Sequence, residues 1–197
     1  MRRCARQPWS GNWAICLLLL AGLAAVRALA GQPDDVSKQF GSRVQANSRF
    51  KAPFATGDFD GDGISDALYL VTVLPASAEN ALASDVAVIG ALFGQEALGA
   101  RPESLALAIV QDGGKKKFLL TGYEGDGVAD FFSSPIWAGP SVPVQVAKRG
   151  SKTFEDFRRQ DGNIKDDIIV VGTEAGIDTA LYWTGHSYAL FQPAEEP

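Results

Sequence analysis

The sequence has very little cysteine and histidine. It contains two cysteines, Cys4 and Cys16, and a single histidine, His186. Both cysteines lie in the first 30 residues, so the rest of the chain has no disulfide, no thiol nucleophile and no zinc site of the usual cysteine and histidine kind. A serine–histidine–carboxylate triad would depend on His186, and the chain has no Gly-x-Ser-x-Gly motif. We therefore expect His186 to be a solvated turn residue.

The first 30 residues contain basic charge and an apolar run, but no acid. Arg2, Arg3 and Arg6 precede an uncharged run over residues 13–26, and Ala28-Leu29-Ala30 follows it. The run is too short for a permanent membrane span, and the small-x-small ending is typical of signal-peptidase cleavage. We predict a signal peptide over residues 1–30 and one exported domain over residues 31–197, periplasmic or extracellular, with no membrane insertion after cleavage.

The predicted exported domain is poor in basic charge. The whole chain has a net charge of −5, and removal of the four arginines of the leader takes the net charge to −9. An acidic protein repels nucleic acid and anionic membranes, so nucleic-acid binding is excluded. The run Lys115-Lys116-Lys117 and the cluster Lys165-Asp166-Asp167 are both interpreted as solvated.

Short runs of β-branched and aromatic residues predict an all-β fold. The small size favours an antiparallel sandwich or a partly open, propeller-like barrel. Val36, Phe40 and Val44 have helical spacing and predict one brief helix, and Asp112-Gly113 predicts a hairpin turn. In the hairpin near the end, Tyr182 and Trp183 are expected to face opposite sides, one toward the core and one outward. Strands are expected over residues 67–73, 86–89, 105–110, 117–120, 168–171, 179–183 and 187–191.

One acidic segment stands out as a candidate metal loop. Alternate residues of a tightly curled loop point inward, and calcium requires six to eight oxygen ligands. If the loop is counted from Asp58 as position 1, Gly63 at position 6 permits a sharp turn. The carbonyl of Ile64 at position 7 can supply a further oxygen. We expect the Ile64 side chain to face the core. Carboxylates at positions 1, 3, 5 and 9 belong to Asp58, Asp60, Asp62 and Asp66.

This loop is not an EF-hand. Position 12 is Tyr69 where an EF-hand has a bidentate glutamate, and the flanking segments are expected to be strands instead of helices. An acidic turn without an ion is the alternative interpretation. In that case four carboxylates would repel one another within nine residues, so calcium is the prediction we keep.

A second, weaker copy of the loop follows 64 residues later. Residues 123–130 repeat the pattern of residues 59–66, with acids at Glu124, Asp126 and Asp130. Position 1 of this copy is Gly122, so the first carboxylate ligand is missing. We interpret the copy as a turn, and metal binding there is the alternative.

The segment Gly57–Leu70, GDFDGDGISDALYL, resembles the calcium loop of the FG-GAP/VCBS-type repeat family, which has integrin-like calcium loops. The hairpin over residues 180–185 resembles the family more loosely. The resemblance implies strand–calcium loop–strand repeats and calcium binding by Asp58, Asp60, Asp62, Asp66 and the Ile64 carbonyl. Propellers use four to eight blades, and this chain is too short for one.

The function we expect is a secreted or periplasmic, calcium-stabilised β module that binds a protein or glycan partner and catalyses no reaction. The alternative is a small secreted hydrolase, or an inhibitor of one, in which calcium is structural. Candidate carboxylates for hydrolysis exist outside the loop, Asp112 among them. Sequence spacing does not place any two of them at a catalytic separation.

Overall fold

The computed structural model describes residues 34–75, 77–89, 104–121, 139, 141–172, 176 and 178–193. All of them belong to the unit Gly31–Pro197. The predicted leader and the second loop, residues 122–130, lie outside the described residues. Within the part that is described, no helix is long and apolar enough to cross a membrane.

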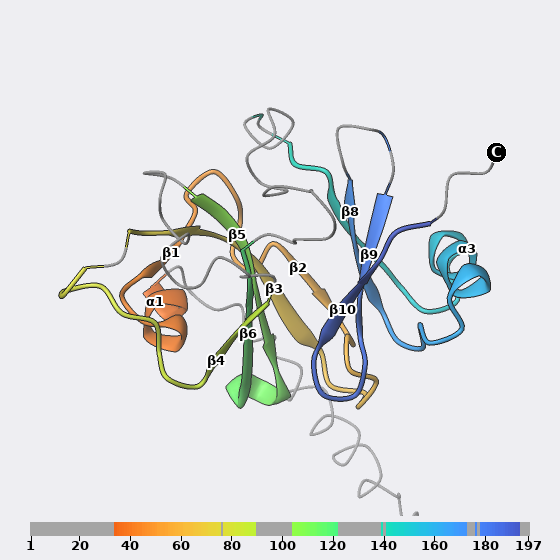
Figure 1. The fold of residues 1–197 in the computed structure, drawn as a ribbon, viewed down its shortest axis with the longest axis horizontal. Helices are drawn as coiled ribbons and strands as arrows, with labels where there is room; N and C mark the ends of the chain where they lie inside the picture. Colours follow the sequence, from red (N-terminus) through yellow and green to blue (C-terminus); the bar gives the residue numbers. More distant parts are fainter. Residues whose placement is uncertain are drawn as a thin grey trace, which may run out of the picture. The chain divides into compact units, whose positions relative to one another are not determined.

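Strands dominate the described residues and form two sheets (Figure 1). The first sheet has the order β1-β3-β5-β6-β4, with β2 also paired to β3, and the second has the order β10-β9-β8-β7. Every pairing is antiparallel except that of β4 with β6, and neither sheet closes into a barrel over the ranges described. The predicted all-β sandwich is confirmed. The strands are β1 (Val44–Ala46), β2 (Ala55–Gly57), β3 (Asp66–Val73), β4 (Val86–Ile89), β5 (Ser104–Gln111), β6 (Lys116–Leu120), β7 (Val144–Ala147), β8 (Ile168–Gly172), β9 (Asp178–Trp183) and β10 (Tyr188–Phe191).

The space between the two sheets is filled by apolar side chains from both. Leu68 and Leu70 of β3 meet Ile169 and Val171 of β8 there, and Phe59 of the acidic loop lies in the same cluster. Because side chains alternate along a strand, the residues between them face outward, and these are also buried. Each sheet must therefore be covered on its outer face as well.

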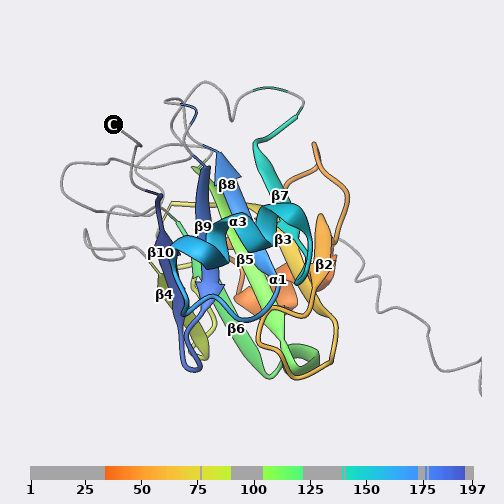
Figure 2. The ribbon, with the colours of Figure 1, turned by 90° about the vertical axis from the view of Figure 1, so that its right-hand side faces the viewer.

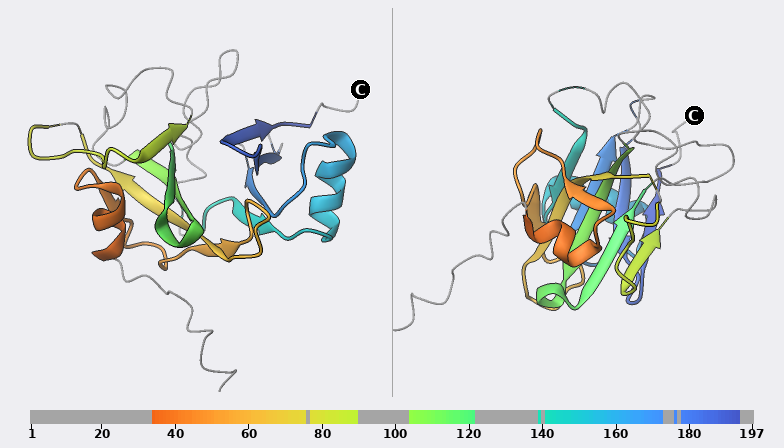
Figure 3. Two further views of the ribbon diagram at one scale, coloured as in Figure 1. Left: turned by 90° about the horizontal axis from the view of Figure 1, so that it is seen from below. Right: turned by 90° about the vertical axis from the view of Figure 1, so that its left-hand side faces the viewer.

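Two helices cover these outer faces, as Figures 1 and 2 show from two sides. Helix α1 (Asp34–Phe40) packs Val36 and Phe40 against the outer face of the first sheet. Helix α3 (Lys152–Gln160) packs Phe154 and Phe157 against that of the second. The left view of Figure 3 shows the resulting sequence of layers, helix–sheet–sheet–helix.

The structure differs from the sequence prediction at both helices. Val44, expected to continue the first helix, begins strand β1, because the chain turns at Gly41 with φ 93°. Helix α3 was not predicted, although its start has a clear signal: Ser151 is the N-cap, and its side chain accepts a hydrogen bond from the Phe154 N–H.

The C-terminal hairpin agrees with the expected alternation. Tyr182 joins the cluster under α3, whereas Trp183 packs against the cluster between the sheets. The two rings therefore face opposite sides, as predicted, but the expectation that one of them faces outward was wrong, because both contact apolar core residues. Trp183 lies edge-to-face with Phe118 and Tyr188 at centroid distances of 5.4 and 5.3 Å.

Candidate metal centre

The acidic loop joins β2 to β3, which pair antiparallel with Gly57 opposite Asp66. The two ends of the loop are therefore held side by side at the end of a ladder, and the residues between them must curl. Gly61 and Gly63 adopt φ values of 76° and 82°, in the left-handed region that favours glycine. At Gly61 a side chain is also excluded by space, since a Cβ would lie 2.3 Å from Asp166 Oδ1.

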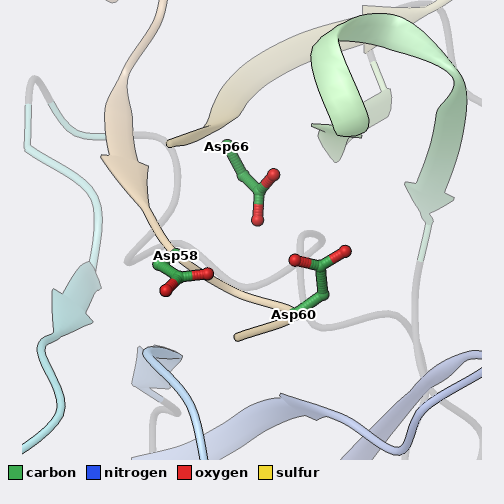
Figure 4. A group of neighbouring side chains, drawn as sticks. All are labelled: Asp58, Asp60 and Asp66. Carbon is green, nitrogen blue, oxygen red and sulfur yellow. The ribbon is translucent and has the colours of Figure 1, made fainter. Parts of the chain in front are cut away.

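The curled loop brings three of its carboxylates together. Ligand oxygens of Asp58, Asp60 and Asp66 all lie within 4.8 Å of one another, and Figure 4 shows the three side chains pointing toward a common space. Asp58 and Asp60 come from the loop, while Asp66 is the first residue of β3. Such separations match the oxygen-to-oxygen spacing around a single cation bound at 2.3–2.6 Å.

Hydrogen bonds within the loop use only part of these carboxylates. The Phe59 N–H donates to Asp66 Oδ2 at 2.8 Å, and the Gly63 N–H donates to Asp58 Oδ2 at 3.2 Å. The other oxygens, Asp58 Oδ1 and Asp66 Oδ1, are buried and accept no hydrogen bond from any described group. A buried acceptor without a partner costs about 1–3 kcal/mol, and more when charged. Two such oxygens facing one space fit a hard cation.

The electrostatics of Asp66 also favour a bound cation. Asp66 is only 2% exposed, and burial is the main reason that its pKa rises to about 7. The hydrogen bond from Phe59 lowers the pKa, while the charges of Asp60, Asp62 and Asp58 raise it further. A carboxylate in this position is costly to ionise without a counter-charge, and a divalent cation supplies that charge.

The structure places Asp62 beside the main group. Its carboxylate gathers with those of Asp60 and Asp112, and its Oδ1 accepts a hydrogen bond from the Ile64 N–H at 2.6 Å. Asp60 belongs to both groups and links them. Of the four predicted acidic ligands, Asp58, Asp60 and Asp66 are thus brought into one cluster, while Asp62 lies on the exposed side of it.

The expectation that the Ile64 side chain faces the core was wrong. Ile64 is 53% exposed and lies between Gly63 and Ser65, which are also exposed. The space below the loop is already taken by Phe59, which is fully buried between the sheets. Phe59 at position 2 therefore anchors the loop, and Ile64 remains at its outer turn.

Sequence reasoning missed two residues that reach the site from the β5–β6 hairpin. Asp112 opens the 3-10 turn η1 (Asp112–Gly114) with a φ of 53°, and Lys116 begins β6. The Lys116 ammonium lies 2.9 Å from Asp112 Oδ2 and 3.4 Å from Asp60 Oδ2. The Asp112-Gly113 turn was recognisable, but its approach to the loop follows from the pairing of β3 with β5, which sequence does not specify.

The acidic cluster at residues 165–167 was expected to be solvated; this holds for the exposed Lys165 but was wrong for Asp167. Asp167 is 8% exposed and accepts hydrogen bonds from the N–H groups of Asp58 at 3.0 Å and Arg149 at 2.8 Å. Its own N–H donates to the Asp58 carbonyl at 3.1 Å. Burial would raise the pKa of Asp167, but the two N–H donors and Lys148 outweigh it and lower the pKa. Asp167 thus fastens the start of the loop to the second sheet.

The chain matches no protein-family model, and no curated protein and no solved structure is significantly similar to it. The FG-GAP/VCBS resemblance therefore stays a prediction that rests on the loop residues. The donor set at the loop consists of carboxylate oxygens, which are the ligands that calcium prefers and zinc uses less.

Proposed function

We propose that the chain is an exported, calcium-stabilised β module of FG-GAP/VCBS type. It binds a protein or glycan partner outside the cytoplasm and catalyses no reaction. The observation that carries this proposal is the convergence of Asp58, Asp60 and Asp66, with a buried oxygen on two of them that accepts no hydrogen bond from the described residues. Calcium bound there would satisfy both oxygens and neutralise the mutual repulsion of the three carboxylates.

The ligand count supports calcium over magnesium. Three carboxylates and the Ile64 carbonyl supply four oxygens, and Asp62 can add a fifth directly or through water. Calcium accepts six to eight ligands in flexible geometry, whereas magnesium requires a near-ideal octahedron and retains several waters. A site assembled from an irregular loop and a strand end suits the less demanding ion.

A stabilising role follows from where the loop is fastened. Its far end begins β3, which lies between β1 and β5 inside the first sheet, and its near end is held to the second sheet through Asp167. An ion that binds only the folded loop stabilises the fold by mass action, by about 2.7 kcal/mol at a calcium concentration a hundred times Kd. Such stabilisation is suited to a domain that has no cysteine after residue 30.

The side chain that supports partner binding is Ile64. It is the one large hydrophobic residue that is exposed within the described ranges, and it projects from the loop that would hold the ion. An apolar side chain beside a cation offers a partner both an apolar contact and a charge. Partner recognition at this loop would then depend on calcium.

The site is tested by calorimetric titration of the chelator-treated chain with calcium chloride. We expect one calcium ion per chain at this loop, loss of that binding in Asp60→Asn, and unchanged binding in Glu79→Gln. Both variants replace one carboxylate by a neutral amide, so they are matched in charge. They differ in place, because the Asp60 side chain is nearly buried within the cluster, whereas Glu79 is an exposed acid in another loop. Binding that survives Asp60→Asn undiminished would contradict the proposed site.

A further inference from the structure

A buried glutamine lies at the end of β5 with half of its amide unused. Gln111 is 0% exposed, and its Nε2 donates to the Tyr188 hydroxyl at 2.7 Å. Its Oε1 is buried and accepts no hydrogen bond from the described residues. An amide oxygen left in this state costs about 1–3 kcal/mol, so it requires a partner beyond those that the described residues supply.

The strand register places Gln111 beside the acidic cluster. Ala67 of β3 pairs with Val110 of β5, so one step further along the same ladder Asp66 lies opposite Gln111. Residues directly opposite in antiparallel strands project to the same face, with Cβ atoms about 4.5–5.5 Å apart. That face is the one between the sheets, because Leu68 and Ile109, the next residues inward, pack there.

Tyr188, the hydrogen-bond partner of Gln111, lies against the same face of the sheet. Tyr188 is buried between the sheets. Burial raises its pKa, and the charges of Asp66 and Asp60 raise it further. With Nε2 held by that hydroxyl, Oε1 is the atom of Gln111 left free to meet a cation.

We propose that the amide oxygen of Gln111 is a direct ligand of the cation bound by the acidic loop, supplied from the neighbouring strand. The inference rests on the proposed calcium site and adds a residue to it. Asp58 Oδ1, Asp66 Oδ1 and Gln111 Oε1 are all buried acceptors without a partner in the part of the chain described. A bound cation can satisfy three acceptors at once, whereas a water molecule donates to two. Glutamine oxygens are ordinary calcium ligands.

A neutral ligand suits this position better than another carboxylate. The cluster already holds three acids, one buried and two partly buried, and a fourth charge would increase their repulsion in the metal-free protein. Tyr188 acts as a positioning residue, because its hydrogen bond to Nε2 fixes which end of the amide faces the cluster. The ligand from β5 would tie the ion to a strand at the middle of the first sheet.

The test counts the water molecules on a bound europium ion, which replaces calcium, from luminescence lifetimes in light and heavy water. Gln111→Met keeps the length of the side chain but removes the oxygen. We expect it to add one water to the bound europium and to weaken calcium binding by at least about tenfold. The matched control is Gln39→Met in α1, which removes another buried amide oxygen that accepts no described hydrogen bond, on the opposite face of the first sheet. This control should change neither value.

The possible failures are distinguishable. If the unmodified chain binds neither europium nor calcium, the proposed site and this inference both fail. If it binds them and Gln111→Met leaves the water count unchanged, only the assignment of Gln111 fails. Should Gln111→Met not fold, Gln111→Glu takes its place and is prepared in calcium, where the ion offsets the added charge. A carboxylate ligand there should keep the water count and tighten calcium binding several-fold, and weaker binding would overturn the assignment.

Discussion

Asp66→Asn should stabilise the calcium-free protein, although it removes a metal ligand. Asp66 is 2% exposed, and its pKa is raised to about 7, above the value of about 3.9 expected in the unfolded chain. Between these two values the native state binds more protons than the unfolded state. The stability of the calcium-free protein must therefore fall as pH rises from about 4 to 7. At 1.36 kcal/mol per pKa unit, the ionised carboxylate costs about 4 kcal/mol at pH 8.

The asparagine variant avoids this cost, because its side chain is neutral and retains an oxygen for the Phe59 N–H. At pH 8 with chelator, its free energy of unfolding should exceed that of the unmodified chain by up to about 4 kcal/mol. At pH 4 the difference should vanish. In millimolar calcium this difference in the free energy of unfolding should become smaller. Calcium stabilises the unmodified chain by about 2.7 kcal/mol at a hundredfold excess over Kd, and it stabilises the variant much less.

Urea denaturation measures these differences at both pH values, with and without calcium. The informative control is Glu79→Gln, which removes an exposed carboxylate and should follow the unmodified chain throughout. The reasoning is refuted if Asp66→Asn is the less stable protein at pH 8 in chelator, or if calcium stabilises it as much as it stabilises the unmodified chain.

Three further outcomes are expected. Lys116→Met should bind calcium several-fold more tightly by calorimetry, because the ammonium beside Asp60 repels the ion, whereas Lys117→Met should not, since Lys117 pairs with Asp85. Asp167→Ala should lose about 3–5 kcal/mol in urea denaturation with or without calcium, because it leaves buried donors and Lys148 without their acceptor. Asp156→Ala, which breaks an exposed pair on α3, should lose less than about 1 kcal/mol. The exported protein should begin at Gly31 by intact mass, and a membrane-bound product that retains residues 1–30 would contradict the leader.

The convergence of carboxylates at the loop is the part that follows from local geometry, and the sequence pattern already indicates it. Alternation around a tight loop brings Asp58 and Asp60 to one side, and the start of the next strand adds Asp66. The exposure of the Ile64 side chain, in contrast, is not set by local geometry. Either an aromatic residue at position 2 or an aliphatic one at position 7 can anchor such a loop, and the choice of Phe59 depends on the space left between the sheets.

Residues that reach the loop from other strands could not be predicted, because their approach depends on which strands become neighbours. Gln111 and Lys116 lie at the site because β5 pairs with β3 and β6 pairs with β5. Asp167 lies there because the second sheet packs on the first. In sequence these are an isolated glutamine, a lysine in a basic run and an acid in a charged cluster, and each pattern is typical of solvated surface.

The most direct test of the account is a crystal structure of the chain grown with calcium, with the ion located by its anomalous scattering. We expect one ion between Asp58, Asp60 and Asp66, with an oxygen of each at about 2.3–2.6 Å. A structure at saturating calcium in which these carboxylates hold only water, or in which the ion lies elsewhere on the chain, would contradict it.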